Sequence, residues 1–173
     1  MDDRKRLFVL RHAKSSWDDP GVDDHERPLA ARGRRATEAM AAHVRAHGIE
    51  PRLVICSSAR RTRETLVGVA PGGQQLIEPG LYSASATDLL QRLRGVPDAT
   101  ESVMVIGHNP ALQVLVLSLA ETADARWGDS DLEAMRSKFP TGALATLSFD
   151  CRWSELAPGR AELDGFVTPK QLQ

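Results

Sequence analysis

Short, uninterrupted runs of apolar residues mark the strands that the sequence predicts. The three strongest runs cover residues 7–10, 53–56 and 102–106. Runs this short, bounded by polar residues, are typical of strands that are buried on both faces of a parallel sheet. Weaker patterns predict strands at 75–78 and 143–149, and the tail that carries Trp153 and Phe166 predicts one more.

Helical patterns lie between these strands. Residues 30–47 are rich in Ala, Arg, Glu and Met, which favour helices, and Ala36, Met40 and Val44 fall on one face. Gly48 is a suitable residue to end this helix. The starts of three more helices are predicted from residues that commonly cap helices. They are Ser57 or Ser58, Thr87 or Asp88, and Asn109 followed by Pro110 in the first helical position.

Strands and helices therefore alternate along the chain. This order predicts an α/β fold of three layers, with helices on both faces of a mostly parallel central sheet. A length of 173 residues fits a single domain spanning 1–173, since domains commonly contain roughly 100–200 residues. Residues 14–29 predict a long loop, and residues 121–140 are polar and irregular, with a short helix predicted near 131–136.

The charge balance limits which partners are expected. The chain has 22 Lys and Arg residues and 23 Asp and Glu residues, which gives a formal net charge of −1. We expect no nucleic-acid partner, because such proteins usually present a strongly basic surface. The apolar stretches are too short for a signal peptide or a membrane span, so we expect a cytoplasmic protein without membrane contact.

Polar groups suited to phosphate follow each of the three strong strands. Arg11 and His12 follow the first strand, Arg61 lies shortly after the second, and His108 follows the third. In open α/β sheets ligands bind beyond the carboxyl ends of the strands, so these groups converge if the strands are parallel neighbours. Guanidinium groups match phosphate oxygens, and helix N-termini add N–H donors. The sequence therefore predicts a phosphate site that contains two histidines.

These residues also resemble a known family. The stretch Arg11-His12-Ala13 after an apolar strand resembles the Arg-His-Gly signature of the histidine phosphatase superfamily, which has the phosphoglycerate mutase-like fold. Ser57 with Arg61 four positions later resembles its second signature, and Gly107-His108-Asn109 resembles the third. The segment 24–29, Asp-His-Glu-Arg-Pro-Leu, resembles a further stretch of that superfamily. The short chain and the Ala13 variant are similar to its SixA-like phosphohistidine phosphatase branch.

The resemblance implies a role for each matching residue. His12 would attack phosphorus and become a phosphohistidine, Arg11 and Arg61 would hold the phosphoryl oxygens, and His108 would complete the pocket. Arg27 would face the pocket from the loop. Ser15 and Asn109 would add further phosphate contacts. No metal or cofactor is expected, since two histidines without clustered carboxylates make a poor magnesium site.

The general acid of the superfamily has no clear match in this sequence. Phosphomonoesterases use a carboxylic acid to protonate the leaving alkoxide. In the corresponding region Glu78 is the only carboxylate, and an ion-paired or solvated strand end explains it as well. An enzyme without this acid is expected to favour P–N over P–O bonds, because imidazole leaves more easily than an alkoxide.

The sequence thus predicts a phosphatase that removes phosphate from phosphohistidine on a protein. One alternative is a phosphatase of small phosphate esters, which would use Glu78, Asp18 or Glu26 as the acid. Another is an inactive module that binds phosphorylated ligands. The large insertions that cap the pocket in bigger superfamily members are absent from the pattern, and an open site would admit a histidine on a protein surface.

Overall fold

A six-stranded sheet forms the centre of the molecule in the computed structural model, which describes residues 3–122 and 129–173. The strands are β1 (Lys5–Arg11), β2 (Leu53–Ser57), β3 (Gln74–Glu78), β4 (Ser102–Gly107), β5 (Leu144–Phe149) and β6 (Glu162–Val167). Their order across the sheet is β3-β2-β4-β1-β5-β6. The first four strands in the chain run parallel, whereas β5 is antiparallel to β1 and to β6.

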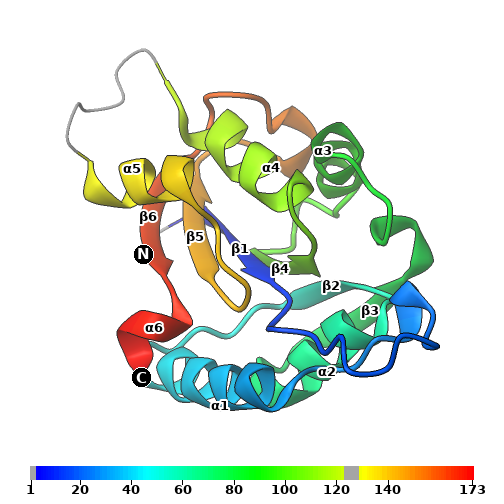
Figure 1. The fold of residues 1–173 in the computed structure, drawn as a ribbon. Helices are drawn as coiled ribbons and strands as arrows, with labels where there is room; N and C mark the ends of the chain where they lie inside the picture. Colours follow the sequence, from blue (N-terminus) through cyan, green and yellow to red (C-terminus); the bar gives the residue numbers. More distant parts are fainter. Residues whose placement is uncertain (1–2, 123–128) are drawn as a thin grey trace.

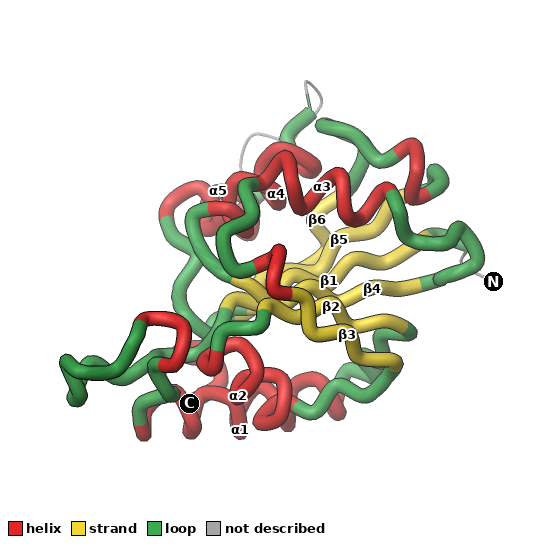
Figure 2. The backbone as a smooth tube through the Cα atoms, turned by 90° about the vertical axis from the view of Figure 1, so that its right-hand side faces the viewer, coloured by secondary structure: helices red, strands yellow, loops and turns green. Residues whose placement is uncertain are grey.

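Helices cover both faces of this sheet (Figure 1). They are α1 (Ala31–Ala46), α2 (Arg60–Val69), α3 (Ala86–Arg94), α4 (Ala111–Ala120), α5 (Ser130–Ser137) and α6 (Pro169–Leu172). Helices α1 and α2 lie below the sheet, and α3, α4 and α5 lie above it, as the turned view in Figure 2 also shows. The predicted three-layer α/β architecture with a mostly parallel sheet is therefore confirmed.

Alternate residues of the central strands supply two separate cores. In β1, Leu7 and Val9 pack with the core on the α3 and α4 side, whereas Phe8 and Leu10 pack with the core on the α1 and α2 side. All four side chains are at most 4% exposed. Side chains alternate across a strand, so a strand covered on both faces must be apolar at every position. This explains why the strands appear in the sequence as uninterrupted apolar runs.

The predicted helix starts differ from the structure in detail. Helix α2 begins at Arg60, with Ala59 rather than Ser57 or Ser58 at its N-cap. Helix α3 begins at Ala86, because Ser85 and Asp88 form a capping box that the sequence prediction missed. The prediction of Thr87 or Asp88 as the first residue was wrong by only one or two positions.

The start of α4 was also predicted one residue too early. Pro110 occupies the N-cap position, so Asn109 lies outside the helix. The Asn109 side chain still accepts a hydrogen bond from the backbone N–H of Gln113 in the first turn, at 3.2 Å. Asn109 therefore satisfies an unpaired donor of the helix from one position further out than a standard cap.

The segment 121–140 contains α5, which covers the short helix predicted near 131–136. Residues 123–128 of that segment lie outside the described residues. Within the described parts of the chain, no helix combines the length and the apolarity needed to cross a bilayer.

Candidate active site

Three adjacent parallel strands bring the predicted site residues together. Strand β1 lies between β4 and β5, and β4 in turn pairs with β2, so the carboxyl ends of β1, β4 and β2 meet at one edge. Arg11 at the end of β1 pairs in register with Gly107 at the end of β4. The next residues in each chain segment are His12 and His108, whose ring centroids are 5.4 Å apart.

The His12 ring is held by the backbone that follows it. Its Nδ1 lies 2.8 Å from the carbonyl oxygen of Ala13, which accepts a hydrogen bond from the Nδ1 proton. The Ala13 N–H donates in turn to the hydroxyl of Thr65 in α2, at 3.0 Å. With the proton fixed on Nδ1, the Nε2 lone pair is free to attack an electrophile.

The surroundings keep His12 neutral. The pKa of His12 is lowered from 6.5 to about 3, chiefly by burial and also by His108, Arg61 and Arg11, against the raising effect of the Ala13 carbonyl. A positive charge on this ring would be both desolvated and close to other cations. The imidazole is therefore unprotonated across the neutral pH range.

Two arginines present unpaired N–H groups at the site. Arg11 donates through Nη1 to the carbonyl of Phe139 at 2.8 Å, and Arg61 donates through Nη1 to the carbonyl of Asp24 at 2.8 Å. The Nε atoms of both arginines are buried and have no hydrogen-bond partner among the described residues. Buried donors are rarely left unpaired, so these two N–H groups indicate a place for an anionic ligand.

His108 is oriented by Ser57 at the end of β2. Its Nε2 lies 2.8 Å from the Ser57 hydroxyl, and its Nδ1 is buried without a partner among the described residues. Ser57 also accepts a hydrogen bond from the backbone N–H of Ala59 at 3.3 Å, which leaves its own proton to donate to Nε2 of His108. When Ser57 donates to Nε2 in this way, the imidazole proton lies on Nδ1, where it can serve a ligand.

His108 is also neutral. Burial lowers its pKa to about 4, with Arg61 as the next cause, whereas the nearby Asp24 carboxylate opposes the shift. A neutral ring can donate one hydrogen bond without repelling the arginines. Ser57 therefore serves the site, which explains why it does not cap α2 as the sequence predicted.

The long loop after β1 carries two more of the predicted residues. Arg27 and Ser15 are both buried and bind each other, because Arg27 Nη1 donates to the Ser15 hydroxyl at 2.8 Å. The exposed Trp17 ring covers the Arg27 guanidinium at 3.6 Å. Both side chains already have partners, so their contact with phosphate stays a prediction.

Asn109 is engaged elsewhere as well. Its Nδ2 donates to the carbonyl of Phe139 at 3.3 Å, the same oxygen that accepts a hydrogen bond from Arg11. Its Oδ1 accepts from the N–H of Gln113. The predicted phosphate contact of Asn109 stays a prediction, and the observed contacts give it a role in positioning the segment that holds Arg11.

Two residues at the site were not singled out from the sequence. Asp24, in a short 3-10 helix (Asp24–Glu26), places Oδ2 3.2 Å from Arg61 Nη2. Tyr82 donates its hydroxyl proton to the same oxygen. From the segment 24–29 the sequence indicated Arg27 and, as an alternative acid, Glu26, but not Asp24. Tyr82, the single tyrosine of the chain, follows a 3-10 helix (Pro79–Leu81) that lacks any periodic pattern.

Glu78, the one carboxylate considered as a general acid by position, is paired with an arginine. Both of its oxygens accept hydrogen bonds from Arg92 in α3, each at 2.8 Å, and this pairing raises the pKa of Arg92. The structure therefore shows Glu78 as an ion-paired strand end, which is the other explanation drawn from the sequence. No cluster of three His, Cys, Asp or Glu residues suited to a metal ion occurs in the described part of the chain.

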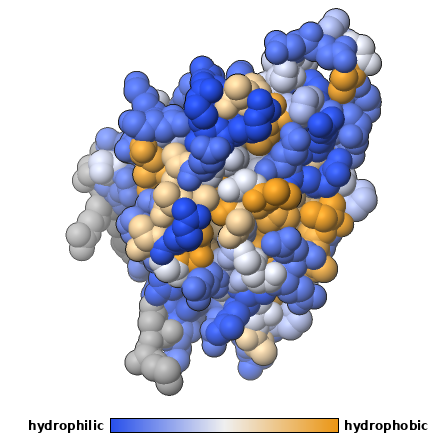
Figure 3. Space-filling model, turned by 90° about the horizontal axis from the view of Figure 1, so that it is seen from below, coloured by the Kyte–Doolittle hydropathy of each residue, from blue (hydrophilic) through white to orange (hydrophobic). Residues whose placement is uncertain are grey.

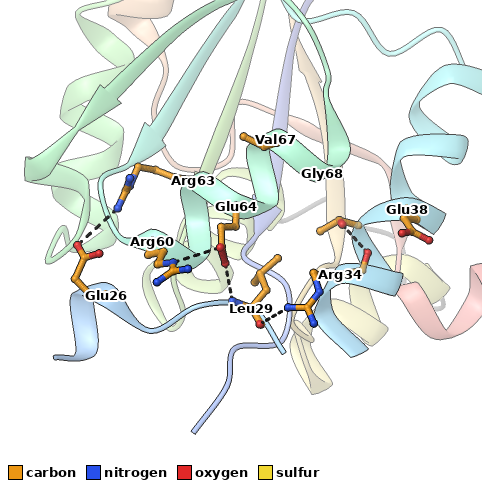
Figure 4. A pocket seen from close by; sticks show the side chains of 10 residues that line it. Glu26, Leu29, Arg34, Glu38, Arg60, Arg63, Glu64, Val67 and Gly68 are labelled. Carbon is orange, nitrogen blue, oxygen red and sulfur yellow. Dashed lines mark hydrogen bonds and ion pairs between the residues drawn. The ribbon is translucent and has the colours of Figure 1, made fainter. Parts of the chain in front are cut away.

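A cavity on the outer face of α1 and α2 is separate from the two histidines. Figure 3 views the molecule from this side, where the surface is mostly hydrophilic with apolar patches. Apart from Glu38, the charged side chains that line the cavity are paired with one another or with the backbone (Figure 4). Glu64 accepts from the N–H of Leu29 at 2.9 Å, and Arg34 donates to the Leu29 carbonyl at 2.9 Å. These contacts fasten the end of the long loop to both helices.

A close backbone contact fastens the start of the same loop. A side chain at Gly33 in α1 would place its Cβ 2.1 Å from the carbonyl oxygen of Lys14, so only glycine fits there. The same carbonyl accepts the N–H of Ala30 at 2.9 Å. The loop is therefore held at both ends, and its middle section places Asp24 against Arg61.

Comparisons with known proteins agree with this geometry. Residues 7–82 match the histidine phosphatase superfamily (branch 1). An uncharacterised protein of Mycobacterium tuberculosis is 33% identical over 161 residues, which cover 93% of this chain and 100% of that protein. The chain belongs to the histidine phosphatase superfamily.

Two further proteins are similar over most of this chain. An uncharacterised chloroplastic protein of Arabidopsis thaliana is 32% identical over 183 residues, covering 95% of this chain and 78% of that protein. A solved structure assigned as the phosphohistidine phosphatase SixA of Nakamurella multipartitia superimposes with a TM-score of 0.86 at 30% identity. That superposition covers 96% of each chain. The predicted resemblance to the superfamily and to its SixA-like members is therefore confirmed.

Proposed function

We propose that this protein is a phosphatase that forms a phosphohistidine intermediate on His12 and dephosphorylates phosphohistidine on a protein. Membership of the superfamily indicates a phosphatase with a phosphorylated substrate. One observation carries the mechanism. The free Nε2 belongs to a neutral His12 beside Arg11, Arg61 and His108, and the buried Arg11 Nε, Arg61 Nε and His108 Nδ1 have no partner among the described residues.

The first step follows from this geometry. The three unpaired N–H groups would bind the phosphoryl oxygens and offset their charge as the group transfers. His12 Nε2 then forms a bond to phosphorus while the bond from phosphorus to the leaving group breaks. Water attacks the phosphohistidine in a second step, which releases inorganic phosphate and restores the neutral imidazole.

The proposed substrate class rests on the ionised state of Glu78 and Asp24, neither of which is available to protonate a leaving group. An alkoxide is a poor leaving group unless a carboxylic acid protonates it. Glu78 is bound by Arg92, and hydrogen bonding by Tyr82 chiefly lowers the pKa of Asp24 to about 2, so Asp24 is ionised. A leaving imidazole needs no such acid when its ring already carries a proton. The structural similarity to a protein assigned as a phosphohistidine phosphatase supports the same choice.

The test compares two substrates and two variants. Phosphate release is measured from a phosphohistidine peptide and from p-nitrophenyl phosphate, with His12→Ala and the surface variant His47→Ala. We expect faster release from the peptide, full activity in His47→Ala, and a loss of about three orders of magnitude or more in His12→Ala, as for other lost nucleophiles. Rapid quenching of the reaction with labelled substrate is expected to trap acid-labile phosphate on the wild-type chain and none on His12→Ala.

The other outcomes separate the alternatives. Faster ester hydrolysis that collapses in Glu78→Gln would support a small-ester phosphatase. Binding of phosphohistidine without turnover would support a module that only binds. Activity that survives in His12→Ala would refute the nucleophile assignment. The cytoplasmic location expected from the sequence stays a proposal, because one similar protein is chloroplastic.

A further inference from the structure

Asp24 occupies a position that the steps above do not explain. Its Oδ1 accepts from Arg27 Nε at 3.0 Å, and its Oδ2 accepts from Arg61 Nη2 at 3.2 Å and from the Tyr82 hydroxyl. An ionised carboxylate has about four acceptor positions, so three donors leave one of them open. The side chain is nevertheless 49% exposed, so the open position can be reached from solvent.

A row of rings connects Asp24 with the nucleophile. The His12 and His108 rings are 5.4 Å apart, and the His108 and Tyr82 rings are 5.6 Å apart. Asp24 lies at the Tyr82 end of this row, bound to the Tyr82 hydroxyl, and its charge acts on His108. The half-exposed carboxylate therefore lies beside Arg61 and Tyr82 and close enough to His108 for its charge to act on that ring.

The chemistry of this position is that of an acceptor. Hydrogen bonds from Tyr82, Arg27 and Arg61 stabilise the ionised form and lower the pKa of Asp24 to about 2. A carboxylate with such a low pKa cannot protonate a leaving group near neutral pH. It can instead accept a hydrogen bond from a leaving group that already carries a proton.

We infer that Asp24 accepts a hydrogen bond from the leaving imidazole ring of a phosphohistidine substrate and thereby selects P–N over P–O substrates. This inference rests on the proposed function. A phosphohistidine ring that is protonated on its second nitrogen is a cation with one N–H to donate. An ionised, solvent-accessible carboxylate beside Arg61 stabilises that protonated form, whereas the leaving group of a phosphate ester offers no such donor.

The step balances without a proton from the protein. His12 Nε2 forms its bond to phosphorus as the bond between phosphorus and the substrate ring breaks. The electron pair of the broken bond stays on the ring nitrogen, and the ring leaves as neutral imidazole with its N–H still directed to Asp24. The Tyr82 and His25 rings, 4.8 Å apart in an edge-on arrangement, provide flat surfaces beside this carboxylate for a planar leaving group.

The decisive measurement is a ratio of two specificities. The value of kcat/KM is determined for a phosphohistidine peptide and for p-nitrophenyl phosphate in wild type, Asp24→Asn and Asp23→Asn. The matched control Asp23→Asn makes the same change in charge at the neighbouring exposed residue. We expect Asp24→Asn to lower the peptide-to-ester ratio about ten- to a hundredfold, the range for one lost charge-assisted hydrogen bond, and Asp23→Asn to leave it unchanged.

Each outcome separates the inference from the proposed function. A wild-type enzyme that does not prefer the peptide would overturn the proposed function itself. A wild-type preference that persists in Asp24→Asn would overturn only the inference. Equal losses on both substrates would also overturn it, because they would show that Asp24 merely positions Arg61.

Asp24→Glu provides a second test if the amide variant folds poorly. It keeps the negative charge, so we expect the preference for the peptide to be largely retained. A peptide-to-ester ratio in Asp24→Glu as low as that in Asp24→Asn would overturn the inference. Melting temperatures of all variants identify any that are unfolded.

Discussion

The protein contains two pairs of neighbouring histidines whose surroundings differ. His12 and His108 lie at the ends of β1 and β4 with ring centroids 5.4 Å apart, whereas His43 and His47 lie at the end of α1 at 4.1 Å. In both pairs one ring nitrogen is bound to a backbone carbonyl, through His12 Nδ1 and through His47 Nδ1. A fixed tautomer alone therefore does not distinguish a reactive histidine.

The difference lies in what surrounds each pair. In the first pair His12 is buried and His108 is partly buried beside Arg11 and Arg61, and their pKa values fall to about 3 and about 4, chiefly through burial. In the second pair His43 is partly buried and His47 is exposed, and burial together with the neighbouring His47 lowers the pKa of His43. The comparison shows that desolvation and unpaired arginine N–H groups, rather than contact between imidazoles, define the candidate site.

Removal of Arg61 should have a large effect on activity. Arg61→Ala is expected to lower kcat/KM about a hundredfold or more, because it removes a donor aimed at developing charge. The neighbouring Arg60 is exposed and paired with Glu64 at 3.4 Å, so Arg60→Ala should change activity by less than about twofold. Steady-state kinetics on one substrate checks both, and equal losses in the two variants would contradict the assignment of Arg61.

Changing the partner of His108 should have a smaller effect. Ser57→Ala removes the hydroxyl that binds Nε2, and we expect kcat/KM to fall about tenfold, the typical result of one lost buried hydrogen bond. Nitrogen-15 NMR of His108 should show the proton redistributed between its two ring nitrogens. Ser58→Ala is the control, since the Ser58 hydroxyl binds His25 instead. An unchanged tautomer in Ser57→Ala would argue against the positioning role.

The two pairs should also differ in how they affect stability as pH falls. Folded His12 and His108 stay neutral down to about 3 and about 4, whereas unfolded histidines protonate near 6.5. The unfolded chain therefore binds more protons between these values, and the free energy of unfolding should fall as pH drops from about 6.5 towards 4. Urea unfolding at several pH values measures this slope.

A matched pair of variants assigns that slope. We expect His108→Asn to make the free energy of unfolding less dependent on pH, whereas His47→Asn should leave the dependence close to that of wild type. An equal effect of both substitutions would contradict the proposed contrast between the buried and exposed histidines.

The sequence predicted the sheet and the residues at its carboxyl edge for a simple physical reason. Strands with two cores beneath and above them must be apolar throughout, so residues 7–10, 53–56 and 102–106 stood out, and the polar residues after them were necessarily at strand ends. The structure brings Arg11, His12, Arg61 and His108 together as this reasoning predicted.

What the sequence did not predict depends on contacts between distant, irregular segments. Asp24 meets Arg61 and Tyr82 across 37 and 58 positions, and neither it nor Tyr82 belongs to a regular helix or strand. Ser57 was predicted as a helix cap because serine favours that position, but its hydroxyl is used by His108. The contacts of Asp24 and Ser57 are therefore set by hydrogen bonds between distant segments, which the local sequence preferences do not reveal.

The pocket is oriented largely by main-chain carbonyls. His12, Arg11 and Arg61 are held by the carbonyl oxygens of Ala13, Phe139 and Asp24 respectively. Every residue type supplies such an oxygen, but the side chains at these positions are constrained for other reasons, because Ala13 and Phe139 are buried and Asp24 binds Arg61 and Tyr82. Replacing Phe139 by alanine would remove core packing against Phe166 while keeping the carbonyl that binds Arg11, so the arrangement of the site depends on the core through the position of the main chain.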